Sequence, residues 1–326
     1  MPAETPSEFD LIERYFKRAA PSALLGVGDD AAIIEPTAGM QLLMSTDMLL
    51  AGTHFLPDAE PEALGWKTLA VNVSDLAAMG ATPRWALLAL ALPAADEAWV
   101  AAFARGFFSC ADAFGVELIG GDTTRGPLNF CVTILGEAPA GQALLRSGAH
   151  VGDDVWISGH PGRAALGLAH LQGRCNLDVA PRGECLVALH RPQPRVRLGL
   201  ALRDVASAAI DVSDGLLADL GHILDASHVS AEIQLDHLPT PIANGQTPNE
   251  LVRDCVLAGG DDYELAFTAA ANCRPRIESL AGSLQLALTR IGTIVQKGAD
   301  KLRLIDTNGH EVAIGRLGYD HFLGPK

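Results

Sequence analysis

The strongest constraint on the fold is an alternation of short apolar runs with longer helical patterns, separated by brief loops rich in Gly, Pro and Asp. Residues 85–92 form an apolar run that stops at Pro93, which is typical of a strand. Residues 61–79 have Pro at their start and are followed by Gly80, which is typical of a helix. Because strands and helices are mixed along the chain, the sequence predicts an α/β fold with mixed, α+β-type sheets.

The pattern predicts a series of elements in two domains. The expected helices are residues 7–19, 61–79, 96–114, 162–171, 214–226 and 249–257. The expected strands are residues 31–34, 42–45, 85–92, 116–119, 130–135, 155–158, 208–212, 231–235, 263–268 and 291–295. A length of 326 residues corresponds to about two domains of ordinary size. Because Ala, Gly, Pro and His accumulate between residues 138 and 153, we expect the domains to be residues 1–145 and 146–326.

The chain carries an excess of negative charge, since 24 Lys and Arg stand against 39 Asp and Glu, a net charge of −15. Nucleic acids and anionic membranes need clustered Lys and Arg, so neither is an expected partner. A phosphorylated small molecule is compatible with this charge, because bound metal ions reverse the local sign. The N-terminal residues lack the features of a secretory signal, and six scattered cysteines form no Cys-x-x-Cys pair. We therefore expect a soluble cytoplasmic protein with reduced thiols.

A glycine-rich loop near the N-terminus carries two adjacent carboxylates. Residues 26–31 nearly match the dinucleotide fingerprint G-x-G-x-x-A, which works by pointing bare backbone N–H groups at a pyrophosphate. Here Asp29 and Asp30 would repel phosphate unless a cation lay between them. The loop therefore favours a metal site over direct nucleotide binding, with an ordinary turn as the alternative.

Further polar residues occur where apolar patterns end or are interrupted. Ser45, Thr46 and Asp47 follow an apolar run and offer three hard oxygen ligands, although a local side-chain turn is the commoner role of such residues. His54 follows shortly afterwards, and a single His is more often an ordinary loop residue. Asp75 lies off the apolar stripe of its predicted helix, so it is either solvated or directed towards the acidic loops.

Two Gly-Gly-Asp clusters and one Asp-x-Ser-Asp segment add to this set. Gly121 and Asp122 suit a close backbone approach to a phosphate whose metal is held by Asp, with a Gly-Gly hairpin as the alternative. Asp211, Ser213 and Asp214 end another apolar run, and Asp214 alone could be a helix N-cap. The second cluster, residues 259–265, includes Glu264.

Arg146 is a candidate phosphate clamp, although a lone exposed Arg usually makes no important pair. Taken together, the acidic loops indicate a site for several metal ions. Hard oxygen donors favour Mg²⁺, whose coordination is often completed by substrate phosphates. The chain contains neither a Walker A motif nor the protein-kinase motifs, so nucleotide chemistry would belong to another fold.

Taken in their order along the chain, these motifs resemble those of the thiamine-monophosphate kinase family, which belongs to the aminoimidazole ribonucleotide synthetase superfamily. The resemblance runs from Gly26 to Tyr319. Its motifs are residues 28–32 (GDDAA), 45–47 (STD), 72–80 (NVSDLAAMG), 120–123 (GGDT), 211–216 (DVSDGL) and 260–265 (GDDYEL).

The resemblance implies in-line transfer of the γ-phosphoryl group of ATP to thiamine monophosphate, giving thiamine diphosphate with the help of several Mg²⁺ ions. It implies a homodimer whose N-terminal domains bind metal and ATP and pair with each other, while the C-terminal domain completes the active site. The implied Mg²⁺ ligands are Asp30, Ser45, Thr46, Asp47, Asp75, Asp122, Asp211 and Asp214. The implied ATP contacts are Gly121, Asp122, Arg146 and Ser213. The implied thiamine phosphate contacts are His54, Glu264 and Tyr319.

No catalytic base is expected, because an attacking phosphate oxygen has a second pKa of about 6 and is already ionised at neutral pH. Several alternatives stay open at this stage. They are a synthetase of the same superfamily that activates an amide or selenide with ATP, a Mg²⁺-dependent phosphohydrolase and a Ca²⁺-binding scaffold. A selenide-using enzyme would carry a reactive Cys near its N-terminus, whereas the first cysteine here is Cys110.

Overall fold

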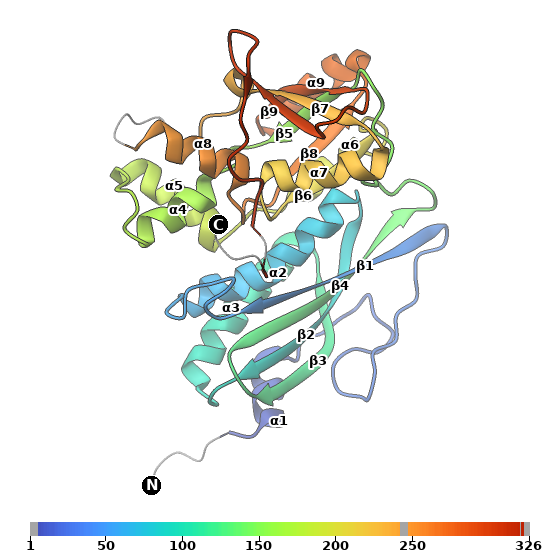
Figure 1. The fold of residues 1–326 in the computed structure, drawn as a ribbon. Helices are drawn as coiled ribbons and strands as arrows, with labels where there is room; N and C mark the ends of the chain where they lie inside the picture. Colours follow the sequence, from blue (N-terminus) through green and yellow to red (C-terminus); the bar gives the residue numbers. More distant parts are fainter. Residues whose placement is uncertain (1–5, 242–246, 320, 323–326) are drawn as a thin grey trace. The chain divides into compact units, whose positions relative to one another are not determined.

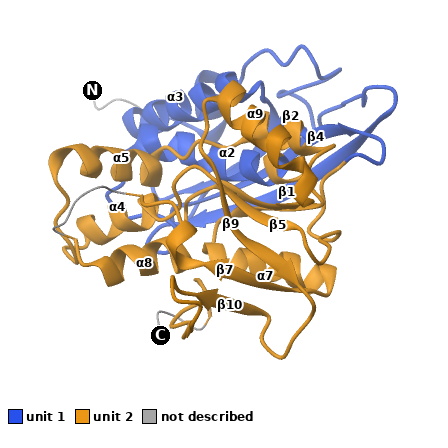
Figure 2. Cartoon of the chain, turned by 90° about the horizontal axis from the view of Figure 1, so that it is seen from above, with its two compact units in different colours: residues 1–76, 81–142 blue, residues 77–80, 143–326 orange. Residues whose placement is uncertain are grey.

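The computed structural model describes residues 6–241, 247–319 and 321–322, and Figure 1 shows the order of its elements. The chain divides into two compact units, drawn in different colours in Figure 2: residues 1–76 with 81–142, and residues 77–80 with 143–326. The predicted domain boundary lies between residues 145 and 146. The functional roles assigned to the two domains remain predictions.

Unit 1 is built on a four-stranded mixed sheet with the strand order β1-β4-β2-β3. Strand β4 pairs antiparallel with both β1 and β2, whereas β2 and β3 are parallel. The strands are β1 (Met40–Leu50), β2 (Thr82–Leu92), β3 (Glu117–Arg125) and β4 (Asn129–Pro139). The long helices are α2 (Pro61–Ala78) and α3 (Glu97–Phe114). They cross closely at two glycines, since a Cβ on Gly106 would lie 1.7 Å from the Glu62 carbonyl oxygen and one on Gly65 would lie 2.0 Å from that of Phe103.

Unit 2 contains a seven-stranded mixed sheet with the order β11-β10-β7-β9-β5-β8-β6. Its strands are β5 (Asp154–Ser158), β6 (Ala208–Val212), β7 (Ser230–Gln234), β8 (Glu264–Ala269), β9 (Leu288–Val295), β10 (Leu302–Ile305) and β11 (Glu311–Val312). Its α-helices are α4 (Arg163–Leu171), α5 (Val179–His190), α6 (Val196–Leu202), α7 (Leu216–Ser227), α8 (Asn249–Ala258) and α9 (Arg274–Leu284).

Successive residues of the central strands of unit 2 point to two different cores, as strand geometry requires. Val155 and Ile157 of β5 pack with α7 residues in one core. Trp156, between them in the sequence, packs in the other core with Leu198 of α6 and Ile277 of α9. Both faces of the sheet are therefore covered, which explains why its strands appear in the sequence as almost continuous apolar runs.

The two mixed sheets with flanking helices confirm the predicted fold class. Two local predictions near the N-terminus need correction. The first helix is only α1 (Glu8–Leu11), capped by Ser7 and continued by the π-helix η1 (Ile12–Phe16). Residues 31–34 form no strand, since only Ile33 makes an isolated bridge, with Leu25. Among the described residues, no helix is both long and apolar enough to cross a membrane.

Candidate active site

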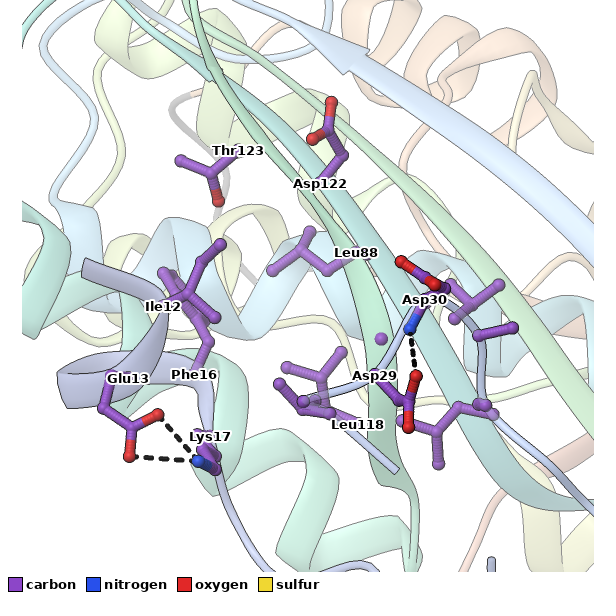
Figure 3. Close-up of a pocket in the computed structure, with 18 of the residues that line it drawn as sticks. Ile12, Glu13, Phe16, Lys17, Asp29, Asp30, Leu88, Leu118, Asp122 and Thr123 are labelled. Atoms are coloured by element: carbon purple, nitrogen blue, oxygen red, sulfur yellow. Dashed lines mark hydrogen bonds and ion pairs between the residues drawn. The ribbon is translucent and has the colours of Figure 1, made fainter. Parts of the chain in front are cut away.

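Unit 1 contains a cavity of about 1190 Å³ that brings together two of the predicted acidic motifs (Figure 3). Asp29 and Asp30 line it from the N-terminal loop, and Gly121 and Asp122 line it from β3. The Asp30 N–H donates to the Asp29 carboxylate at 2.9 Å, so Asp29 makes a hydrogen bond within its own loop, and both aspartates are exposed. The structure therefore places the carboxylates of Asp30 and Asp122 around one cavity of unit 1, although they are 92 positions apart in sequence (122 − 30).

Gly120 and Gly121, the double glycine before Asp122, lie inside strand β3, so the predicted alternative of a Gly-Gly hairpin is wrong. The β2–β3 pairing shifts register between Ala86 and Leu87, which leaves the strand locally irregular. Gly121 has φ 148°, and a Cβ there would lie 1.8 Å from the Leu88 carbonyl oxygen. Glycine is thus required for β3 to approach β2 at the residue before Asp122.

A second group of predicted ligands joins β1 to α2. Ser45, Thr46 and Asp47 lie in the middle of β1, so the expectation that they end a strand is wrong. The Ser45 hydroxyl donates to the partly buried Asp75 carboxylate, and the Asp47 N–H donates to Asn72 Oδ1 at 3.0 Å. Asp75 is therefore directed towards β1, and its role as a metal ligand stays a prediction.

Thr46 does not join this group through its side chain. Because side chains alternate along a strand, Thr46 faces the opposite side of the sheet from Ser45 and Asp47. Its hydroxyl lies 2.9 Å from the Thr133 hydroxyl of β4. Any contact of Thr46 with a ligand bound beside Asp75 would therefore be made by its backbone.

His54 lies in the turn that follows β1. Its Nδ1 accepts the Leu50 N–H at 3.0 Å, and its own N–H donates to the Leu50 carbonyl at 3.0 Å. A neutral imidazole with Nδ1 as acceptor carries its proton on Nε2. In the neutral form of this half-buried ring, the proton is therefore on Nε2.

In unit 2, the loop after β6 is organised by a carboxylate that the sequence analysis missed. Oδ2 of Asp219, in the first turn of α7, accepts the N–H groups of Ser213, Asp214 and Gly215 at 3.0, 3.0 and 3.1 Å. Burial and the charge of Asp214 raise the Asp219 pKa from 3.8 to about 7, although the three N–H groups act in the opposite direction. The only sequence signal was an acid in the first turn of the helix. Asp211, on β6, is itself buried.

The chain's tail returns to the same loop. The Tyr319 N–H donates to the Asp214 carbonyl at 2.9 Å, and the Ala218 N–H donates to the Leu317 carbonyl at 3.1 Å. A Cβ on Gly318 would lie 2.6 Å from the Ala218 Cβ, so glycine permits this docking. The structure thereby brings Tyr319, 38% exposed, beside Asp214.

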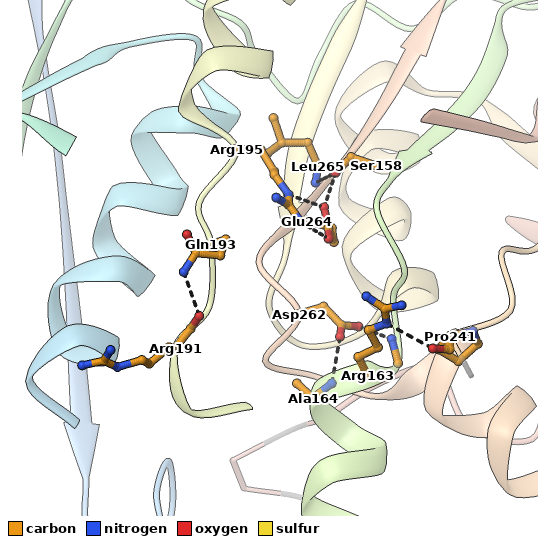
Figure 4. Close-up of polar contacts among 11 residues, drawn as sticks. Ser158, Arg163, Ala164, Arg191, Gln193, Arg195, Pro241, Asp262, Glu264 and Leu265 are labelled. Carbon is orange, nitrogen blue, oxygen red and sulfur yellow. Dashed lines mark hydrogen bonds and ion pairs between the residues drawn. The ribbon is translucent and has the colours of Figure 1, made fainter. Parts of the chain in front are cut away.

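Glu264 begins β8 and is 5% exposed. Its carboxylate accepts two hydrogen bonds from Arg195 and one from Ser158 (Figure 4). Asp262, two residues earlier, accepts the Gly162 N–H at 2.6 Å just before α4. Burial raises the Asp262 pKa well above its usual value. The second acidic cluster is therefore held largely by internal bonds.

Within unit 2, Arg146 is not brought to the Ser213–Asp214 loop. Its carbonyl accepts the hydroxyl of Ser227, the last residue of α7, whereas Ser213 and Asp214 precede the first residue of this helix. The 12 residues of α7 span about 18 Å at 1.5 Å per residue.

Among residues 6–241, 247–319 and 321–322, no three His, Cys, Asp or Glu side chains form a group that could hold a metal ion by themselves. The donors near the unit 1 cavity and between β1 and α2 are carboxylates and a hydroxyl, which are hard oxygen ligands. Mg²⁺ commonly binds through one or two carboxylates together with substrate phosphates. These donors therefore fit a Mg²⁺ ion that is shared with a phosphate ligand.

Comparisons with known proteins show the family of this chain. Residues 28–138 match the family model "AIR synthase related protein, N-terminal domain". The thiamine-monophosphate kinase of Escherichia coli (strain K12) is 45% identical over 98% of this chain and 99% of its own length. The crystal structure of thiamine-monophosphate kinase from Stenotrophomonas maltophilia K279a has a TM-score of 0.82 and 49% identity, covering 90% of this chain and 93% of that one. The structure "AaThiL complexed with AMPPCP and TMP" has a TM-score of 0.75 and 30% identity, covering 88% and 89%.

Proposed function

We propose, on the premise that the chain belongs to the thiamine-monophosphate kinase family, that it transfers the γ-phosphoryl group of ATP to thiamine monophosphate. The observation that carries the proposal is 45% identity to a thiamine-monophosphate kinase over nearly the whole of both chains. Support also comes from the similar structure of AaThiL with AMPPCP and TMP. The predicted family is confirmed, and this chain is a kinase.

We propose that the transfer is in line and is assisted by several Mg²⁺ ions, which when bound spread the negative charge of the β- and γ-phosphate oxygens. Asp30 and Asp122 would hold metal at the unit 1 cavity, and Asp75 would do so beside β1. The remaining proposed ligands are Ser45, Thr46, Asp47, Asp211 and Asp214. Because the acceptor phosphate is already ionised, these residues need to align and neutralise the reactants rather than remove a proton.

Contacts with the two organic reactants are also proposals. Gly121, Asp122, Arg146 and Ser213 are assigned to ATP. His54 and Tyr319 are assigned to the thiamine phosphate: His54 lies in the turn after β1, and Tyr319 has a partly exposed ring. Glu264 is assigned to the same substrate, although its carboxylate already accepts bonds from Arg195 and Ser158.

Release of ADP tests the function directly. With ATP and Mg²⁺, ADP formation should depend on thiamine monophosphate, appear together with thiamine diphosphate in equal amounts, and stop when EDTA removes the metal. A phosphohydrolase would release ADP without the acceptor, and a scaffold would release none. ADP release that is indifferent to thiamine monophosphate would refute the proposal.

We propose that the protein is a cytoplasmic homodimer paired through β1. This strand is at an edge of the unit 1 sheet and exposes an apolar row on the face that also carries Thr46. The row consists of Met40, Leu42, Met44, Met48 and Leu50, with exposed fractions of 39%, 36%, 68%, 52% and 39%. A row of exposed apolar side chains of this kind is typical of an interface.

Charge placed in the middle of this row should separate the protomers. Met44→Glu combined with Met48→Glu is expected to give a monomer in sedimentation analysis, because two carboxylates would be buried without partners at the interface. Val187→Glu is the control, since Val187 is 58% exposed on α5 of unit 2 and should leave the dimer intact. A dimer that persists in the double variant contradicts this interface.

A further inference from the structure

A partly buried ion pair in unit 2 joins the start of β8 to the residue before α6 (Figure 4). Arg195 Nε donates to Glu264 Oε2 at 2.7 Å, and Arg195 Nη2 donates to Oε1 at 2.5 Å. The Ser158 hydroxyl donates to Oε2 at 2.5 Å. Two parallel bonds from one guanidinium fix both the position and the plane of the carboxylate.

The surrounding backbone is shaped to admit this carboxylate. Gly159 has φ 58°, and a Cβ there would lie 1.9 Å from Glu264 Oε1. The Ser158 hydroxyl also accepts the Leu265 N–H at 2.9 Å, so it acts as both a donor and an acceptor. The backbone and Ser158 are therefore arranged around the Glu264 carboxylate. Loss of the Arg195 guanidinium alone would leave this buried carboxylate with too few hydrogen-bond donors.

Glu264 ends a loop whose backbone is strained. Asp261 has φ 70° and Tyr263 has φ 52°, a left-handed conformation that is unfavourable for residues other than glycine. Such conformations persist only where the surroundings hold them. The Tyr263 hydroxyl donates to Asp261 Oδ1 at 3.0 Å, and Glu264 fixes the end of the loop.

The same loop lies against the segment that follows β6. The Asp261 N–H donates to the Ser213 carbonyl, and the Tyr263 N–H donates to the Val212 carbonyl, both at 2.8 Å. A Cβ on Gly260 would lie 2.6 Å from the Ser213 carbonyl oxygen, which shows how close the two backbones are. Displacement of the loop would therefore move Ser213 and its neighbour Asp214.

We propose that Arg195 is a positioning residue that acts through Glu264: it holds the loop of residues 259–263 and thereby the backbone of Ser213 and Asp214. The inference rests on the proposed function, in which Ser213 contacts ATP and Asp214 holds Mg²⁺. It also gives Glu264 an anchoring role, in addition to the contact with the thiamine phosphate proposed above.

A second ion pair of the same geometry provides a matched control. Arg274 donates two bonds to Asp154, at 2.6 and 2.7 Å, and Asp154 is 1% exposed at the opposite end of β5 from Ser158. Arg274→Met should also cost stability, because the buried Asp154 carboxylate then keeps only the 3.3 Å bond from Arg290 among these guanidinium bonds. Only Arg195→Met should disturb the nucleotide site.

The test combines turnover with direct binding of a non-hydrolysable ATP analogue and Mg²⁺, measured by calorimetry. Arg195→Met should raise the KM for ATP and the Kd of the analogue about tenfold, with the KM for thiamine monophosphate changed less than about threefold. Arg195→Lys should recover part of the affinity, since it retains a charge and a donor. The double variant Arg195→Met/Glu264→Gln should bind the analogue better than Arg195→Met, because no charge is then left unpaired.

Equal effects of Arg195→Met and Arg274→Met on the Kd of the analogue would overturn the proposal. A rise in the KM for thiamine monophosphate alone would also overturn it, because Arg195 would then act at the acceptor. If Arg195→Met fails to fold, the double variant and Arg195→Lys decide by the same Kd. Failure of the proposed function would be seen separately, as wild-type protein that binds the analogue but shows no turnover dependent on the acceptor.

Discussion

Replacement of Asp122 by Asn is expected to lower the rate of ADP formation about 10³-fold, because a metal ion contributes several kcal/mol of charge stabilisation in phosphoryl transfer. Asp122 lies on β3 beside the cavity that Asp30 also lines. An amide has nearly the same size as a carboxylate but lacks the negative charge that holds a cation. The loss should therefore be in catalysis and in the Mg²⁺ concentration required.

The fold should survive this change. Asp122 is exposed, and surface substitutions usually alter stability by less than about 0.5 kcal/mol. Asp112→Asn is the matched control, since Asp112 is an exposed acid of α3 that makes a 3.4 Å surface pair with Arg18. Thermal unfolding and ADP release should be measured for both variants. Full activity of Asp122→Asn would remove Asp122 from the metal site.

Without metal, the free energy of unfolding should fall as the pH rises from about 5 to 8, because of Asp219. Burial and Asp214 raise its folded-state pKa from 3.8 to about 7, so the folded state binds a proton more tightly than the unfolded state between these values. This stabilisation is complete below the unfolded pKa and is lost as the pH passes through the folded pKa. Its size is on the order of a few kcal/mol.

Asp219→Asn should remove this dependence, since an amide does not titrate in the range. Denaturant unfolding in EDTA at several pH values would measure it. Asp225→Asn is the control on the same helix: Asp225 is exposed, pairs with Lys301 at 2.6 Å and has a lowered pKa, so the slope between pH 5 and 8 should remain. The same slope in wild type and Asp219→Asn would show that Asp219 is not its source.

Elements with a strong local pattern could be predicted from the sequence, whereas those defined by distant contacts could not. Strand β6 and helix α3 lie within about one residue of their expected bounds. The strand predicted for residues 31–34 is wrong because these apolar residues belong to a loop. Ala32 and Ile34 pack from this loop against Trp85 and Ile119. Helix α5 was missed because Pro181 and Gly183 interrupt its pattern.

The candidate site also has a part that could be predicted from the sequence and a part that could not. Acidic motifs were visible because each combines Asp with Gly or hydroxyl residues over a few positions. The partners that orient them were not, because Arg195 is 69 positions from Glu264 and Ser45 is 30 positions from Asp75. Thr46 shows a further limit, since its side chain was assigned with its neighbours although strand alternation places it on the other face.

The docking of Leu317 and Tyr319 on α7 has a consequence for biosynthesis. Residues 317–319 leave the ribosome after every strand of both sheets, and domains generally fold in the order in which they are made. Unit 1 and the sheet of unit 2 can therefore form while the loop around Asp214 still lacks its last backbone partner. Premature termination just before Leu317 would yield a chain that contains all the strands but lacks this cover. Translation of the tail would then be the step that completes the site.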